Sequence, residues 1–426
     1  MERRKERILL CLCHLSGNEQ KFVQEAFDTN WVVPLGPNVN GFENDLENFV
    51  NQKDNEKEKL NKRVVALSAG TAAVHLGLLA CGVGPGDEVL VQSFTFCASS
   101  HPITYLGATP VFIDSEKDSW NMDPDLLEVA IKDRISKTGK KPKAIVPVAL
   151  YGMPYRIDRI MEIANKYDIP VVEDAAEGFG SKFKGQVLGT FGKYGVLSFN
   201  GNKMITTSGG GALITANDDE WREIMMYATQ YRESYPYYQH EKIGYNYRMS
   251  NICAGIGRGQ MTIVNEHIAH HKKVQKLYEE LLKDVPGIKV HSQPTTGEYD
   301  SNYWLCTMTI DENVKVKGQE NAYKQVVTGA VGGAAGVIHA AESAHTDCEP
   351  NANVEAMRMG LDALNIESRP LWKPMHKQPV YKNAPAYVNG VSEALFKVGM
   401  CLPAGPYVTE DDVRFICEAI KSLIEK

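Results

Sequence analysis

The sequence of 426 residues contains no run of 18 consecutive apolar residues, which excludes an ordinary transmembrane helix. Arginine and lysine residues do precede a short apolar stretch, Ile8–Cys13, in the order that a signal peptide would have. That stretch is too short for a signal peptide, and no small-residue cleavage site follows it. We therefore expect a cytoplasmic protein without a membrane partner.

Long blocks of like charge are also absent. The net charge is −7, no five consecutive charges share a sign, and the densest charged stretch, Lys53–Arg63, mixes both signs. A nucleic-acid-binding protein usually carries a basic patch or tail. We therefore expect no nucleic-acid partner.

The sequence lacks the dense, even cysteine spacing of a disulfide-rich secreted protein, because its nine cysteines are scattered. Cys11–His14 does not have the spacing of a zinc site, and the sequence has no second pair of ligands that could complete such a site. His267, His270 and His271 share one helical face, which could bind a metal. A solvated face beside Lys272 is the favoured interpretation, and no metal is predicted.

Residues 64–215 alternate apolar stretches of strand length with stretches of helical periodicity, which is typical of an α/β domain with a mostly parallel sheet. The expected strands are Val64–Leu67, Glu88–Gln92, Pro110–Asp114, Lys143–Leu150, Pro170–Glu173, Gly195–Phe199 and Ala212–Thr215. The expected helices are Ala72–Cys81, Asp123–Asp133 and Ile157–Tyr167.

The remaining sequence predicts a smaller α+β domain and an N-terminal arm. The expected elements are a helix at Glu19–Thr29, helical periodicity over Ile252–Leu282, strands at Ile288–His291 and Tyr303–Ile310, and a helix at Asn353–Leu364. We divide the chain into an arm (residues 1–50), a large domain (51–265) and a small domain (266–426). A Gly- and Ala-rich tract at about 316–350 is interpreted as a flexible or helical surface insertion.

Three chemical features lie where expected strands end. Lys203 lies between a strand and a glycine-rich turn, where partial desolvation favours the neutral amine that forms a Schiff base, although most lysines are solvated surface charges. Asp174 ends a strand, where open parallel sheets place ligands, but it could instead cap a helix. Ser68–His75 follows a strand and opens a helix, so its free N–H groups could hold a phosphate, or its small residues could serve packing alone.

An amine, a carboxylate and an anion cradle are together what pyridoxal phosphate needs. Asp174 would keep the pyridine nitrogen protonated, and either Phe94 or Phe96 could stack on the ring, although core packing is the default for both. A nicotinamide cofactor is disfavoured. Gly82–Gly86 follows a helix and precedes a strand, which is the reverse of a dinucleotide fingerprint.

With these features in place, the chain resembles the DegT/DnrJ/EryC1/StrS family of sugar aminotransferases over nearly its whole length. The resemblance rests on Leu15–Glu19, Phe42–Glu43, Gly70–Ala73, Gly84–Val89, Tyr151–Gly152, Glu173–Ala176, Gly189–Gly192, Ser198–Phe199 with Lys203, and Gly244–Arg248. It implies the α/β fold of type I pyridoxal-phosphate-dependent aminotransferases, with a large and a small domain.

The resemblance also implies roles for individual residues. Lys203 matches the lysine that forms the Schiff base and shuttles protons, and Asp174 matches the partner of the pyridine nitrogen. The other matches are Phe96 as the stacking ring, Glu177 at the phenolic oxygen, Gly70, Thr71 and Ser198 at the phosphate, and Asn246 at the phosphate of a neighbouring subunit. The last match implies a homodimer with shared active sites.

Two further segments, Asn30–Pro37 and Arg369–His376, are similar to those of the bacillosamine-pathway branch of the family. That branch aminates a UDP-linked 4-keto-6-deoxy N-acetylhexosamine, and L-glutamate is the donor that the resemblance implies. The substrate contacts it implies are Asn30, Trp31, Val32, Val33, Arg369, Pro370, Leu371, Trp372 and His376. For Arg369 and Trp372, a structural ion pair and a core ring stay open as alternatives.

Several functional alternatives also stay open. Within the family, these are an aminotransferase for a GDP-linked sugar of the perosamine type or for a dTDP-linked sugar. Outside it, they are a nicotinamide-dependent oxidoreductase and a non-catalytic protein that binds nucleotide-sugars on the same fold. Lys203 argues against the related dehydratases, in which a histidine replaces the lysine.

Overall fold

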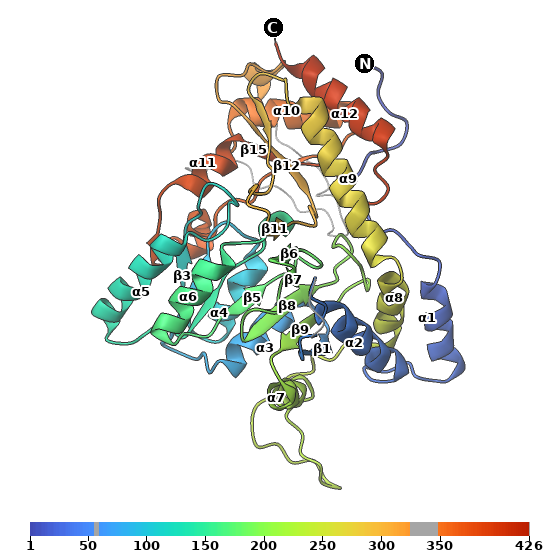
Figure 1. The fold of residues 1–426 in the computed structure, drawn as a ribbon, viewed down its shortest axis with the longest axis vertical. Coiled ribbons are helices and arrows are strands. Elements are labelled where there is room, and N and C mark those ends of the chain that lie inside the picture. The colour runs from blue at the N-terminus through green and yellow to red at the C-terminus, as the bar shows by residue number, and fades with distance from the viewer. Residues whose placement is uncertain (55–58, 324–347, 426) are drawn as a thin grey trace.

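The computed structural model describes residues 1–54, 59–323 and 348–425, so most of the Gly- and Ala-rich tract lies outside the described residues. At its centre is a mostly parallel sheet (Figure 1). Its strands are β1 (Arg63–Leu67), β2 (Glu88–Gln92), β3 (Thr109–Ile113), β4 (Ala144–Val146), β5 (Val172–Asp174), β8 (Tyr194–Ser198), β9 (Gly211–Thr215) and β14 (Ala386–Tyr387). The strands form two four-stranded sheets, in the orders β14-β3-β2-β4 and β1-β9-β8-β5. Isolated bridges between Ile145 and Val171 and between Val148 and Asp174 join the two into one larger sheet. β9 runs antiparallel to both of its neighbours, β1 and β8.

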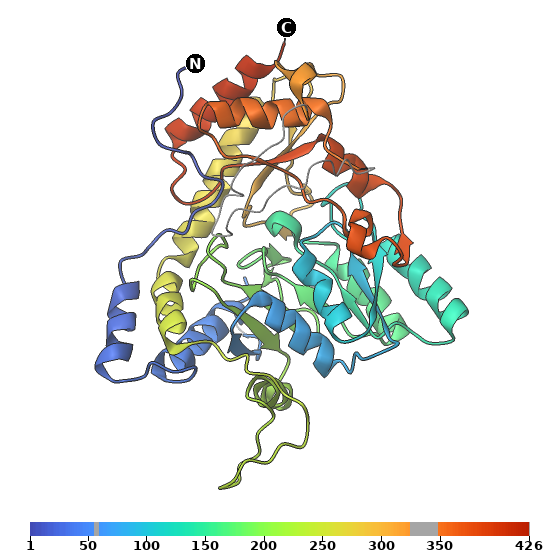
Figure 2. The ribbon, with the colours of Figure 1, turned by 180° about the vertical axis from the view of Figure 1, so that it is seen from behind.

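Helices cover both faces of this sheet, because its strands are apolar on both sides (Figures 1 and 2). On β2, Leu90 packs in the cluster that contains Leu127 and Ile160, whereas Val89 and Val91 pack in the cluster of α3. Successive strand residues therefore anchor helices on opposite faces. The helices are α3 (Gly70–Ala80), α4 (His101–Tyr105), α5 (Pro124–Thr138), α6 (Ile157–Tyr167) and α7 (Asp218–Ala228).

A second, antiparallel sheet forms the upper part of the molecule in Figure 1. Its strands are β10 (Ile288–Val290), β12 (Cys306–Ile310), β15 (Gly399–Leu402) and β13 (Arg369–Pro370), and the helices beside it are α9 (Val264–Leu282), α10 (Ala352–Ala363) and α12 (Glu410–Leu423). These elements share a core cluster of their own. Further elements are α11 (Val391–Val398) and a small sheet of β6 (Lys182–Phe183), β7 (Gln186–Val187) and β11 (Tyr299–Asp300). Within the described ranges, no helix has the length and apolarity needed to cross a membrane.

The N-terminal 50 residues contain two helices where the sequence analysis expected one. Besides α1 (Glu19–Asp28), the helix α2 (Pro37–Val50) starts with proline at its first position and buries Phe42 and Leu46 against β1 and α8 (Asn251–Met261). The turn residues around Gly36 therefore start a helix instead of ending the arm.

The expected helix Ile252–Leu282 is interrupted, because α8 ends at Met261 and α9 begins at Val264. The interpretation of its histidines as a solvated face is wrong, since His267 and His271 are buried. Burial lowers the pKa of His271 to about 3, so its ring is neutral. In the part of the chain that the structure describes, no group of three or more His, Cys, Asp or Glu residues could hold a metal ion.

Candidate active site

A cavity of about 320 Å³ lies where β1, β2, β5 and β8 end. Such strand ends are where α/β sheets hold ligands, because the loops after parallel strands meet there. Most of the wall comes from these loops, and Trp304 and Trp372 close it from the C-terminal part of the chain. Lining residues from the sheet side include Gly70, Thr71, Phe96, Ser99, Asp174, Glu177, Ser198, Asn202 and Lys203.

A larger hollow of about 1030 Å³ lies between the N-terminal segment and α12. Two of its arginines are already in ion pairs, Arg4 with Asp412 at 3.0 Å and Arg7 with Asp362 at 2.6 Å. We therefore assign the chemistry to the smaller cavity, where an amine and carboxylates face an apolar wall.

Lys203 projects its amine into the cavity from the loop after β8. The backbone N–H of Lys203 donates to Asn200 O at 3.0 Å, which turns the chain immediately after the strand. Its Nζ lies 3.4 Å from Glu177 Oε1, and its side chain is only 14% exposed. The amine is therefore held at a defined place and largely out of solvent.

Asp174 is the last residue of β5 and is buried at the cavity. One carboxylate oxygen accepts a hydrogen bond from Ser99 Oγ at 2.6 Å, and the other accepts from the backbone N–H of Ala176 at 3.1 Å. Burial raises the pKa of Asp174, while these hydrogen bonds and the charge of Lys203 oppose that rise. Between Asp174 and the start of β6 at Lys182, all of which the structure describes, the chain forms no helix. The alternative role of Asp174 as a helix cap therefore has no support.

Glu177 joins Lys203 to the chain after β4. Its Oε2 accepts a hydrogen bond from the backbone N–H of Tyr151 at 2.7 Å, while Oε1 faces Lys203. Burial raises the pKa of Glu177, and the positive charge of Lys203 opposes this effect most strongly. Tyr151 has a left-handed backbone conformation (φ 54°), which is unfavourable for a residue with a side chain. The hydrogen bond from its N–H group to Glu177 helps to stabilise this turn.

The start of α3 faces the cavity with free N–H groups, because Ala69 at the N-cap position has no side-chain cap. A Cβ atom on Gly70 would lie 2.9 Å from Ser198 Cβ, so glycine is required for this close approach. The positive end of a helix dipole and a nearby serine hydroxyl suit a phosphate group. Gly70, Thr71 and Ser198 thus form a cradle of the expected kind.

The two candidate stacking rings have different places. Phe94 is fully buried in the core, whereas Phe96 is 48% exposed and lines the cavity. The ring of Phe96 lies 5.4 Å from that of Trp372. The structure therefore offers Phe96 to a ligand and leaves Phe94 to packing.

Of the residues expected to contact substrate, only Trp372 is among those that line this cavity. Leu371 is buried in the core beside Gly399, and His376 Nδ1 lies 2.7 Å from Ser93 Oγ. Arg369 pairs with Glu367 at 3.0 Å, so its alternative role in a structural ion pair has a partner in the structure. Pro370 is half-buried in β13, where it pairs with Met400 of β15.

The other expected substrate contacts lie on the N-terminal arm, away from this cavity. Asn30, Trp31, Val32 and Val33 are exposed in the loop after α1. Asn246 is likewise exposed. It bridges to Thr229 where the segment between α7 and α8, which projects from the body (Figures 1 and 2), returns toward the sheet.

Trp304 and Ser99 line the cavity but were not predicted from the sequence. Ser99 follows the predicted Phe96 by three residues and could have been found as a hydroxyl on the same loop. Trp304 comes from the segment before β12, distant in sequence from every predicted site residue, and only the folded chain brings it to the cavity.

The cavity fits pyridoxal phosphate, because its cradle would hold the phosphate and Asp174 would lie at the pyridine nitrogen. Phe96 would cover one face of the ring, and the amine of Lys203 would meet the aldehyde. These groups come from four separate loops, and the fold brings them to one wall.

Comparison with known proteins agrees with this assignment. The family model of the DegT/DnrJ/EryC1/StrS aminotransferase family matches residues 14–330 and 320–421, and the chain belongs to this family. It is a pyridoxal-phosphate-dependent sugar aminotransferase with the fold that the sequence predicted.

Three similar proteins illustrate the relationship. EpsN of Bacillus subtilis (strain 168) is 39% identical over 98% of this chain and 96% of its own length. Its full name describes it as a pyridoxal phosphate-dependent aminotransferase. The GDP-perosamine synthase of Caulobacter vibrioides is 32% identical over 98% of each chain. The crystal structure of a DegT DnrJ EryC1 StrS aminotransferase from Brucella abortus superposes with a TM-score of 0.80 over 96% of each chain, at 26% identity.

Proposed function

We propose that the enzyme transfers an amino group from L-glutamate to the C4 ketone of UDP-2-acetamido-2,6-dideoxy-hex-4-ulose, a step in making amino sugars for glycans. The observation that carries the proposal is the placement of Lys203, Asp174 and the phosphate cradle around one cavity. The choice of sugar rests on the resemblance of Asn30–Pro37 and Arg369–His376 to the bacillosamine-pathway branch.

The principal residues of the cavity then have separate tasks. When bound, the cofactor supplies an aldehyde and an electron-accepting ring. Gly70, Thr71 and Ser198 bind its phosphate, and Asp174 keeps a proton on the ring nitrogen. Lys203 accepts and returns protons at Nζ as the amino group moves first from glutamate and then to the sugar.

Glu177 and Phe96 orient the ring in this scheme. Glu177 would contact the phenolic oxygen of the cofactor, and Phe96 would cover one face of its ring. Trp372 lies next to Phe96 and offers a face for the sugar or base of the substrate.

We further propose a homodimer in which each subunit completes the other's site. Asn246 is exposed and does not line its own cavity, and the segment between α7 and α8 on which it lies also exposes Tyr235, Tyr237, Tyr238 and Ile243. Large apolar side chains gathered on a projection are typical of an interface. Asn246 would reach the phosphate group in the neighbouring subunit.

A panel of UDP-, dTDP- and GDP-linked 4-keto sugars, each offered with L-glutamate, tests the substrate assignment. The proposal expects an amine at C4 of the UDP-linked N-acetyl sugar, identified by NMR of the product. Activity on the GDP-linked sugar alone would instead support the second candidate, a perosamine-type aminotransferase, which the 32% identity to GDP-perosamine synthase favours.

A further inference from the structure

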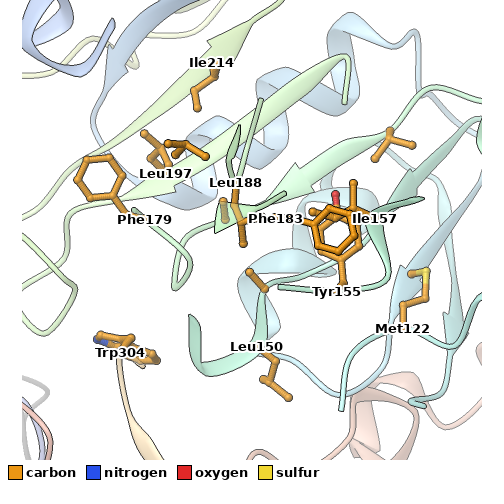
Figure 3. Packing of buried hydrophobic residues seen from close by; sticks show 14 of the residues in the cluster. Met122, Leu150, Tyr155, Ile157, Phe179, Phe183, Leu188, Leu197, Ile214 and Trp304 are labelled. Carbon is orange, nitrogen blue, oxygen red and sulfur yellow. The ribbon is translucent and has the colours of Figure 1, made fainter. Parts of the chain in front are cut away.

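The indole ring of Trp304 lies against the amine of Lys203, and the proposed function gives this contact no task. The Nζ atom lies 4.1 Å from the ring centroid, within the range of a cation–π interaction. Trp304 is 2% exposed, so little water competes with the ring for an ammonium group. Figure 3 shows Trp304 on the chain that leads into β12.

Three hydrogen bonds hold this ring in place. The backbone N–H of Trp304 donates to Asn302 Oδ1 at 2.8 Å, and the ring Nε1 donates to Asn202 O at 2.6 Å. Asn302 Nδ2 in turn donates to Glu177 O at 2.9 Å. The ring is therefore tied both to the residue before Lys203 and to the carboxylate residue on its other side.

The charged and titratable groups around the amine agree with a place for a cation. Glu177 Oε1 lies 3.4 Å from Nζ, and Asp174 and the thiol of Cys11 interact with Lys203 electrostatically. These groups come from β5, the loop after it and the N-terminal segment, and the ring of Trp304 comes from the segment before β12.

We propose that Trp304 is a positioning residue that holds the ammonium group of Lys203 while this amine is not bonded to the cofactor. The inference rests on the proposed function. The neutral amine of Lys203 accepts the proton that leaves the α-carbon of glutamate, and the electron pair of that C–H bond stays with the substrate carbon and the cofactor ring. The resulting ammonium rests between Trp304 and Glu177, from which it returns the proton to the substrate in the next step.

The first test uses the protein without cofactor and needs no activity. In protein labelled with [13Cε]lysine, the ε-proton signal of Lys203, identified by its loss in Lys203→Arg, should be shifted upfield by the ring current of Trp304. Trp304→Leu should abolish that upfield shift. A Lys203 signal at an ordinary lysine position in the wild-type protein overturns the proposal.

The second test measures the half-reaction with L-glutamate and with α-deuterated L-glutamate. Trp304→Leu should slow this half-reaction by about tenfold, the size of a desolvated cation–π contact, and raise its deuterium isotope effect. An unchanged isotope effect in Trp304→Leu overturns the proposal. If Trp304→Leu does not fold, Trp304→Phe is measured in its place. The expected result is then a smaller upfield shift of the Lys203 signal and a deuterium isotope effect above that of the wild type.

Trp120→Phe is the matched control, since Trp120 is also a buried tryptophan but stacks on His291 away from the cavity. It should keep the wild-type isotope effect. Borohydride reduction separates the two proposals. If reduction leaves no pyridoxyl group on Lys203 of the wild type, the proposed function fails. If the group is present on Lys203 in both wild type and Trp304→Leu but the two tests above show no change, only the role of Trp304 fails.

Discussion

At the residue scale, the buried charge of Asp174 is needed for the proposed catalysis but lowers the stability of the folded protein. Its carboxylate is buried, and this burial raises the pKa of the folded state above the ordinary value of 3.8. A group with a raised pKa contributes stability that is fully present below its unfolded pKa and is lost as the pH rises through the folded pKa. Asp174 therefore lowers the free energy of unfolding of the cofactor-free protein at neutral and alkaline pH.

Asp174→Asn tests this at the residue scale. The amide keeps an oxygen for the Ala176 N–H and places an N–H₂ group beside Ser99 Oγ, so the pocket keeps its hydrogen bonds without the charge. In thermal unfolding of the cofactor-free protein, the variant should gain stability relative to wild type as the pH is raised from about 4 to 8. Transamination should fall by about 10² to 10⁴-fold, because the ring nitrogen loses its anionic partner.

An Asp174→Asn protein that loses stability at pH 8 would show that the charge has a structural role. Glu177→Gln is a useful comparison, since burial also raises the pKa of Glu177, but its charge additionally faces Lys203. Its gain in stability should therefore be smaller.

At the scale of the elements, Asn251 joins the N-terminal arm to α8. Its Oδ1 accepts hydrogen bonds from the backbone N–H groups of Asn38 at 2.9 Å and Val39 at 3.2 Å, in the first turn of α2. Its Nδ2 donates to Trp31 O at 2.9 Å. One buried side chain thus caps α2 and fixes the loop that precedes it.

Asn251→Ala should lower the free energy of unfolding by about 1–3 kcal/mol, because it leaves buried backbone groups unpaired. Asn251→Asp keeps the acceptor at the helix start but places a carboxyl oxygen beside Trp31 O, so its loss should be smaller at acidic pH, where the protonated carboxyl group can donate to Trp31 O. Urea unfolding measures both, with Asn265→Ala at an exposed position of α9 as the control. Equal losses in the Ala and Asp variants at acidic pH would contradict the capping role.

The elements that the sequence predicted well are those with a strong local signal. Seven of the eight strands of the large sheet, all except β14, were predicted within a few residues because each is a short apolar run, and α6 matches its expected bounds. The helix α2 was missed because the Pro34–Pro37 turn signals hid the spacing of Val39, Phe42 and Leu46. Contacts between distant segments, such as Trp304 with Asn202, have no local signal and could not be predicted.

At the scale of the whole molecule, the proposed dimer has shared active sites, because Asn246 is exposed and does not line the cavity of its own subunit. Subunits with Lys203→Arg and subunits with Asn246→Asp should each be nearly inactive as homodimers. After mixing, unfolding and refolding, half of the subunits pair with the other kind. Each such heterodimer then has one site with both defects and one with none.

In an equal mixture, half of the dimers are heterodimers, and half of the sites in these are intact. We therefore expect recovery of about a quarter of the wild-type activity. The measurement is the aminotransferase rate of the mixture against that of each homodimer refolded alone. No recovery in a mixture shown by differential tagging to contain heterodimers would mean that Asn246 acts within its own subunit.

The division into an arm, a large domain and a small domain stays a prediction at this scale. The apolar residues around the antiparallel sheet form their own core, separate from the two clusters on the faces of the large sheet. The cavity lies where the two sheets approach, so its wall is complete only when Trp304 and Trp372 are in place.

The role of Lys203 is the central claim, and borohydride reduction of the cofactor-loaded protein tests it most directly. Peptide mass spectrometry after reduction should find one pyridoxyl group, on the peptide that contains Lys203, and none in Lys203→Arg. A pyridoxyl group on another lysine, or none on the wild-type protein, would contradict the account.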